Sequence, residues 1–125
     1  MRAMQKPEPI TVYGIPNCDS VRKARAWLDA RGLAYTFHDF KKQGVPDEKL
    51  DRWLRECGLD RILNRKGTTW RQLDTAVQAE AAHEAGARAL MRNQTSVIKR
   101  PVIEWGRGAR VTVGFDPEGY ERLLA

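Results

Sequence analysis

The stretch Ile10-Thr11-Val12-Tyr13-Gly14-Ile15-Pro16-Asn17-Cys18-Asp19-Ser20 decides the expected fold. Residues 10–14 alternate and are rich in β-branched and aromatic types, which predicts a strand. Apolar residues then recur at helical spacing in residues 21–28, and Gly32 is expected to follow the last turn of this helix. Residues 34–38 have a second strand-like pattern. A strand, a helix and a strand in so short a stretch predict a βαβ unit with parallel strands.

The middle of the chain is predicted to be helical. Pro46 suits a first helical turn, and the apolar positions that follow lie on one helical face: Leu50, Trp53, Leu54 and Cys57. A short helical piece is expected at residues 59–63. The alanine-rich residues 74–92 predict either one helix or two helices broken near Gly86.

Strand patterns return near the end of the chain. Residues 102–105 and 110–113 flank a glycine-rich turn at 106–109, which predicts a hairpin. Asp116 is expected to cap a last helix, with Pro117 in its first turn. The expected fold class is therefore α/β, βαβ followed by ββα in one mixed sheet. Residues 1–9 are expected to form a flexible lead-in and residues 10–125 a single domain, with a helical insertion at about 45–96.

Composition narrows the class of protein. The chain has 125 residues, 22 Lys and Arg against 16 Asp and Glu, and a net charge of +6, with both signs mixed along the sequence. No apolar run approaches the roughly 18 residues of a membrane span, and no secretory signal is recognisable, so a cytoplasmic protein without membrane attachment is expected. Two Cys and two His without zinc-site spacing predict no metal. The chain has no long block of Lys and Arg of the kind that favours nucleic-acid binding, so a nucleic-acid partner is not expected.

Cys18 is the candidate catalytic residue because it stands where the first helix should begin. The free N–H groups and the positive dipole end of a helix favour thiolate over thiol, and thiolate is the nucleophile. Asp19 opposes this effect unless its carboxylate points away from the sulfur. The alternative hypothesis is that Cys18 is only a small residue tolerated at a turn, without a chemical role.

Three motifs resemble those of the arsenate reductase-like ArsC/Spx/YffB family, most closely its YffB branch. They are Gly14-Ile15-Pro16-Asn17-Cys18-Asp19, Asn64-Arg65-Lys66-Gly67 with Thr68-Thr69-Trp70, and Ile98-Lys99-Arg100-Pro101. The resemblance covers about residues 10–124 in order and spacing. It implies a thioredoxin-like fold with an extra helical segment between its two halves.

The resemblance also implies the roles of several residues. Arginines at the positions of Arg65 and Arg100 line an anion site beside the cysteine, and a guanidinium can bind an oxyanion or a carboxylate through two donors. Pro101 falls where thioredoxin-like folds place a cis-proline facing the cysteine. Asn17 is expected to shape the active-site loop, or only to supply turn geometry.

Two departures from the family pattern bear on function. Val21 stands where a Cys-x-x-Cys motif would have its second thiol, so a mixed disulfide on Cys18 needs an outside thiol or Cys57. Glutathione is favoured, because Cys57 completes an apolar helical face. Arsenate reductases also carry a third arginine late in the hairpin, where this chain has Val113-Gly114-Phe115.

These observations predict a glutathione-dependent thiol-disulfide reductase acting on a small thiol or disulfide substrate. No cofactor is expected to bind tightly; glutathione is the expected co-substrate, and glutaredoxin is a candidate partner. The resemblance to Spx implies an alternative, a regulatory protein that binds RNA polymerase. Arsenate reduction is the least favoured reading, because one anion-binding charge is missing.

Overall fold

The computed structural model describes residues 9–106 and 110–125, which fall into two compact units. The first unit holds the chain up to His38 and from Arg100 onward, and the second holds Asp39–Lys99. The expected lead-in at 1–9 lies almost wholly outside the described residues, as does most of the expected turn at 106–109. That the helical segment is an insertion into one domain stays a prediction.

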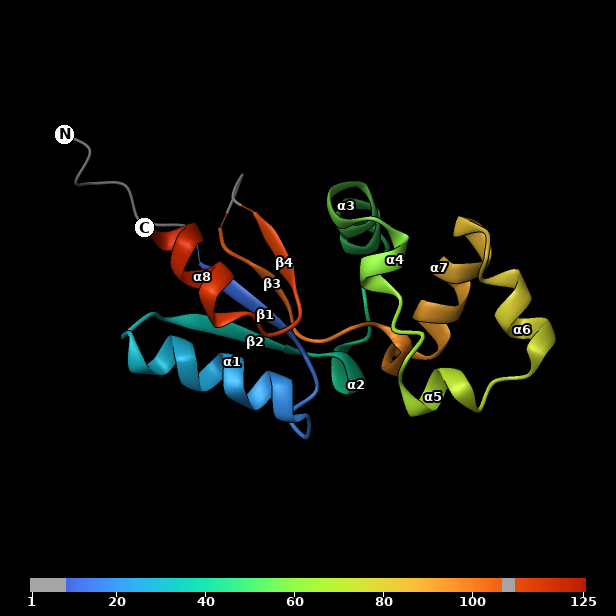
Figure 1. Cartoon of the computed structure of the whole chain (residues 1–125), viewed down its shortest axis with the longest axis horizontal. Helices are drawn as coiled ribbons and strands as arrows, with labels where there is room; N and C mark the ends of the chain where they lie inside the picture. Colours follow the sequence, from blue (N-terminus) through green and yellow to red (C-terminus); the bar gives the residue numbers. More distant parts are fainter. Residues whose placement is uncertain (1–8, 107–109) are drawn as a thin grey trace. The chain divides into compact units, whose positions relative to one another are not determined.

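The first unit is built on a four-stranded sheet with the order β2-β1-β3-β4 (Figure 1). Strand β3 pairs antiparallel with both β1 and β4. Strands β1 and β2, which precede and follow helix α1 in the sequence, run in the same direction. The elements of this unit are β1 (Ile10–Gly14), α1 (Asp19–Ala30), β2 (Tyr35–Asp39), β3 (Val102–Glu104), β4 (Val111–Val113) and α8 (Pro117–Leu124). The predicted mixed sheet and thioredoxin-like α/β fold are therefore confirmed.

Both helices of this unit pack on one face of the sheet. The buried side chains that meet there come from α1, α8 and the strands: Val12, Ala24, Leu28, Ile103, Trp105 and Tyr120. The Trp105 and Tyr120 rings lie 5.0 Å apart in an edge-to-face arrangement, a geometry that aromatic pairs favour. Removal of these side chains from water is the main force that holds the helices on the sheet.

Local signals define the ends of the helices in this unit. Gly32 has φ +68°, and the Gly32 and Leu33 N–H groups donate to the Asp29 and Leu28 carbonyls at 3.0 Å each. This is the glycine-terminated end predicted for α1. At α8, Asp116 Oδ1 accepts a hydrogen bond from the Gly119 N–H at 3.1 Å, and Pro117 is the first helical residue. The predicted cap of α8 is confirmed.

The second unit consists of short helices. They are α2 (Phe40–Gln43), α3 (Asp47–Cys57), α4 (Leu59–Ile62), α5 (Thr68–Arg71), α6 (Thr75–Glu80), α7 (Glu84–Asn93) and the 3-10 helix η2 (Thr95–Val97). Helices α3 and α4 match the predicted ones. Helices α2 and α5 were not predicted, because each is a single turn whose sequence carries too few residues for a periodic pattern.

The alanine-rich segment forms two helices, one of the two predicted alternatives, but Gly86 itself does not lie in the break. The helices separate at residues 81–83, and Gly86 lies inside α7. A Cβ atom at position 86 would lie 2.1 Å from the Glu80 carbonyl oxygen. Gly86 is therefore explained by the close approach of the end of α6, not by chain reversal, and sequence spacing could not reveal that approach.

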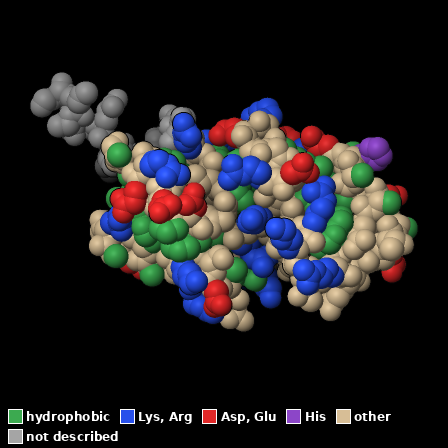
Figure 2. Space-filling view, in the orientation of Figure 1, with side chains coloured by type: hydrophobic (Ala, Val, Ile, Leu, Met, Phe, Trp, Pro, Cys, Tyr) green, Lys and Arg blue, Asp and Glu red, His purple; other side chains and the backbone are tan. Residues whose placement is uncertain are grey.

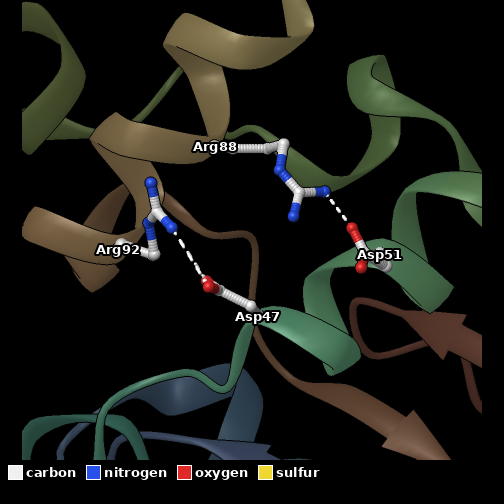
Figure 3. Close-up of polar contacts among 4 residues, drawn as sticks. All are labelled: Asp47, Asp51, Arg88 and Arg92. Carbon is white, nitrogen blue, oxygen red and sulfur yellow. Dashed lines mark hydrogen bonds and ion pairs between the residues drawn. The ribbon is translucent and has the colours of Figure 1, made fainter.

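Two ion pairs join α3 to α7 within the second unit (Figure 3). Arg92 NH1 lies 3.0 Å from Asp47 Oδ1, and Arg88, one turn earlier in α7, pairs with Asp51, one turn later in α3. The two aspartates are four residues apart in α3, and the two arginines are four residues apart in α7. An acidic face of α3 therefore meets a basic face of α7. We call these four residues the α3–α7 clasp.

Candidate active site at the start of helix α1

Cys18 is the N-cap of α1, directly after the loop that follows β1. Its backbone is extended, with φ −139° and ψ 127°, and its side chain is half-buried. Gly14 allows the strand end to approach this helix, because a Cβ there would lie 2.7 Å from Val21 Cγ2. The sequence-predicted position of the cysteine at a helix start is therefore confirmed.

The surroundings of Cys18 favour the thiolate. Partial burial raises the pKa of the thiol, but the Val21 N–H, the Arg100 guanidinium and the Ser20 N–H together hold it below its ordinary range. Arg100 acts both by donating a hydrogen bond to the sulfur and by its charge. Hydrogen bonds and positive charge stabilise the ionised form, whereas desolvation alone would favour the neutral one.

The pairing of β1 with β3 brings Arg100 to Cys18. Tyr13 of β1 is opposite Val102 of β3, so Arg100, two residues before β3, comes beside the loop after β1. The Arg100–Pro101 peptide bond is cis, as the resemblance implied. Pro101 is buried, and its carbonyl oxygen accepts a hydrogen bond from the Gly114 N–H at 2.8 Å.

Arg65 belongs to the second unit, where it follows the segment that pairs Leu63 with Ile98. Its NH1 lies 3.1 Å from Asp60 Oδ1, and its guanidinium carbon lies 5.8 Å from the centre of the Trp70 ring. The Arg65 side chain is 39% exposed. Its guanidinium is thus held near an aromatic face and can still reach solvent.

Asn17 contributes through its side chain rather than through turn geometry alone. Its Oδ1 accepts a hydrogen bond from Arg22 NH1 at 3.2 Å. The sequence motifs do not indicate a role for Arg22 at this site. The signal that could have drawn attention to it is its place one helical turn after Cys18.

Cys57 is the last residue of α3 and is half-buried. Burial raises the pKa of its thiol and is the largest effect; the charge of Arg61 lowers it, Glu56 raises it and Arg52 lowers it, in decreasing order of size. The predicted apolar face of this helix is buried at Leu50, Trp53 and Leu54. Both cysteines are free thiols in the structure.

The hairpin end holds no cation at the position of the third arginine. Val113 is buried, Gly114 has φ +85°, and the Phe115 ring lies 5.8 Å from that of Tyr120. This stretch is next to the cis-proline, because Gly114 donates its N–H to Pro101. An apolar end of the hairpin therefore lies beside Pro101, where the resemblance would place an anion-binding arginine.

The described part of the chain has neither a metal-binding cluster nor a membrane-spanning helix. Within residues 9–106 and 110–125, no group of three or more His, Cys, Asp or Glu side chains is arranged to hold a metal ion. In the same part of the chain, every helix is too short or too polar to cross a membrane. Figure 2 shows Lys and Arg side chains on the visible face with acidic side chains among them, in line with the mixed charge of the sequence.

Comparison with known proteins identifies the family. The model of the ArsC family matches residues 13–123. The chain belongs to the ArsC family. The match includes the Cys18 loop, the Arg65 segment and the Arg100–Pro101 segment, the three motifs that suggested it.

The proteins similar to this chain include both arsenate reductase-related proteins and transcriptional regulators. A solved structure described as YffB (PA3664) is 49% identical, with a TM-score of 0.86, over 93% of this chain and 99% of that one. A protein from Brucella melitensis described as related to arsenate reductase is 45% identical, with a TM-score of 0.72, over 96% and 98% of the two chains. The global transcriptional regulator Spx 1 of Bacillus cereus is 26% identical over 92% of this chain and 86% of its own.

Proposed function

We propose that this ArsC-family protein is a glutathione-dependent thiol-disulfide reductase with Cys18 as its nucleophile. The observation that carries the proposal is the position of Cys18 as the N-cap of α1, where the first amides of the helix and the Arg100 guanidinium hold the pKa of its thiol below the ordinary range. A thiolate is present in a larger fraction near neutral pH when its pKa is lowered. The family contains arsenate reductase-related proteins, which supports a thiol-based reaction.

The proposed reaction has two exchange steps. The Cys18 thiolate attacks the glutathione sulfur of a mixed disulfide, forms a Cys18–glutathione disulfide and releases the substrate thiolate, which takes up a proton. The thiolate of a second glutathione attacks the glutathione sulfur bound to Cys18, which releases oxidised glutathione and regenerates the Cys18 thiolate. One substrate disulfide is reduced while two glutathione units are joined. Because Val21 stands where a local second cysteine would be, the mixed disulfide is resolved by an outside thiol or by Cys57, and glutathione is the thiol that we propose.

Arginine side chains are the proposed binding residues for the carboxylates of glutathione. Arg100 is beside the sulfur and can bind a carboxylate near the reacting atoms. Arg65 is proposed as a second anion-binding residue, since its exposed guanidinium could exchange Asp60 for a ligand carboxylate. We assign Asn17 and Pro101 to the shape of the pocket around Cys18, and place the reaction in the cytoplasm, where glutathione is abundant.

Mass spectrometry after incubation with oxidised glutathione tests the proposal. We expect one glutathione adduct on Cys18 in the wild-type protein and in Cys57→Ser, and none in Cys18→Ser. Turnover is then measured as reduction of a glutathionylated peptide with added glutathione, with and without glutaredoxin. Equal labelling of wild-type protein and Cys18→Ser, or labelling of Cys57 alone, would contradict the proposal.

A regulatory protein that binds RNA polymerase is the second candidate function. The relatives described as global transcriptional regulators favour it, at 26% identity for the Bacillus cereus protein. Recovery of polymerase subunits from lysate on the immobilised protein, together with no turnover of disulfide substrates, would support this candidate. Turnover without polymerase binding would reject it.

Arsenate reduction is the third reading and the least favoured. The apolar residues Val113 and Phe115 occupy the stretch where the resemblance places a third arginine. A small oxyanion depends on each charge around it more than a tripeptide does, because glutathione offers several groups to bind. A coupled assay with arsenate, glutathione and glutaredoxin decides this point; we expect no arsenate-dependent oxidation of glutathione.

A further inference from the structure

The guanidinium of Arg22 contacts the residues on both sides of Cys18. Its NH1 donates to Asn17 Oδ1 at 3.2 Å, and its NH2 donates to Asp19 Oδ1 at 2.6 Å. The Arg22 backbone N–H also donates to the Cys18 carbonyl oxygen at 2.9 Å. One residue, a helical turn after the cysteine, therefore holds three consecutive residues of the active-site loop.

The ion pair between Arg22 and Asp19 bears on the ionisation of Cys18, because Asp19 is the neighbouring residue. A carboxylate next to a thiol favours the neutral thiol, because two negative charges close together repel each other. The Asp19 side chain is 83% exposed, and its carboxylate forms its ion pair with Arg22. Asp19 is the acidic residue in the first turn of α1, directly after Cys18, and Arg22 is the cation that pairs with it.

We propose that Arg22 is a positioning residue for Cys18, which bridges Asn17 and Asp19 and neutralises the carboxylate beside the sulfur. This inference rests on the proposed function, since it concerns the reactivity of the same thiolate. The planar guanidinium can donate to two acceptors at once, whereas a lysine ammonium is a point charge without that fork. Lysine at position 22 should therefore keep the charge effect and lose the bridge to Asn17.

The groups that act on Cys18 come from two segments. The Ser20 and Val21 N–H groups come from α1, and Arg100 comes from the segment before β3. The proposal adds the Asp19–Arg22 pair of α1, which directly follows Cys18. Removal of Arg22 leaves the amides and Arg100 in place and frees the Asp19 carboxylate. The thiolate fraction should then fall at neutral pH, and removal of the Asp19 charge as well should restore it.

The test is the pH dependence of iodoacetamide alkylation of Cys18 in the full chain, followed on the Cys18 peptide by mass spectrometry. We expect Arg22→Gln to be alkylated about threefold more slowly than wild type at pH 7, through a raised midpoint. Arg22→Gln combined with Asp19→Asn should return to the wild-type midpoint, and Arg22→Lys should stay close to it. Far-UV circular dichroism confirms that each variant is folded.

Lys23→Gln is the matched control, because it removes one exposed positive charge from the adjacent position of α1. Its midpoint should equal that of wild type. An unchanged midpoint in Arg22→Gln, failure of Asp19→Asn to restore the double variant, or an Arg22→Lys midpoint equal to that of Arg22→Gln would overturn the role of Arg22. An ordinary thiol midpoint in the wild-type protein would instead overturn the proposed function itself.

Discussion

The two cysteines of this chain stand at opposite ends of helices and differ accordingly. Cys18 precedes the first turn of α1, where backbone N–H groups and Arg100 hold its pKa below the ordinary range. Cys57 ends α3, where burial and Glu56 raise the pKa of its thiol. The pKa values of two side chains of the same type are thus shifted in opposite directions, by helix-start amides and an arginine at Cys18 and by burial at Cys57.

The largest expected effect is selective alkylation. At pH 7 we expect iodoacetamide to modify Cys18 at least about tenfold faster than Cys57, because more of Cys18 is thiolate at that pH. The rate of Cys18 should reach half its maximum below the pH of an ordinary thiol, and that of Cys57 above it. Peptide-level mass spectrometry across pH 5 to 10, roughly the range that brackets thiol ionisation, measures both curves. Equal midpoints for the two residues would remove the contrast.

Arg100→Gln should reduce the difference in alkylation rate between the two cysteines by slowing the reaction of Cys18. The variant loses both the hydrogen bond to the sulfur and the positive charge, so alkylation of Cys18 at pH 7 should slow about fivefold while Cys57 is unaffected. The same pH series measures this change. Arg110→Gln, an exposed arginine next to β4, is the charge-matched control and should leave the Cys18 midpoint unchanged. An Arg100→Gln midpoint equal to wild type would show that the helix amides alone activate the thiol.

Loss of an ion pair of the α3–α7 clasp should lower the stability of the unit that contains Cys57 and leave the reactivity of Cys18 unchanged. Asp47→Asn removes one ion pair, and we expect the free energy of unfolding to fall by about 0.2–1 kcal/mol, and by less at high salt. Urea unfolding at low and high salt measures both values. Glu48→Gln, also exposed in the first turn of α3, is the control for loss of negative charge at a helix start. A loss independent of salt would contradict an electrostatic clasp.

The smallest expected effect concerns Arg61. Its charge lowers the Cys57 pKa in opposition to burial, so Arg61→Gln should slow alkylation of Cys57 about twofold at pH 8. Cys18 provides the internal reference in the same sample, and its rate should not change. A faster reaction of Cys57 would mean that the substitution exposes the thiol and that burial, rather than charge, dominates.

Sequence-based prediction succeeded where the signal is local. The helix start after Cys18, the glycine end at Gly32 and the cap at Asp116 each depend on residues within one turn, so their patterns could be read directly. It failed for Gly86, whose role depends on the approach of another helix, and it overlooked Arg22 as a partner of Asn17. The family resemblance supplied Arg65, Arg100 and the cis bond before Pro101, which local pattern alone could not.

The sequence by itself determined that a cysteine begins the first helix, because a strand pattern, a loop with proline and a helical repeat follow one another within twenty or so residues. Only the tertiary structure decided which charges act on that sulfur. Arg100 reaches Cys18 because Tyr13 pairs with Val102, and the register of an antiparallel pair depends on which side chains the sheet must bury. Direct contacts between distant residues follow from this packing, and no local pattern encodes them.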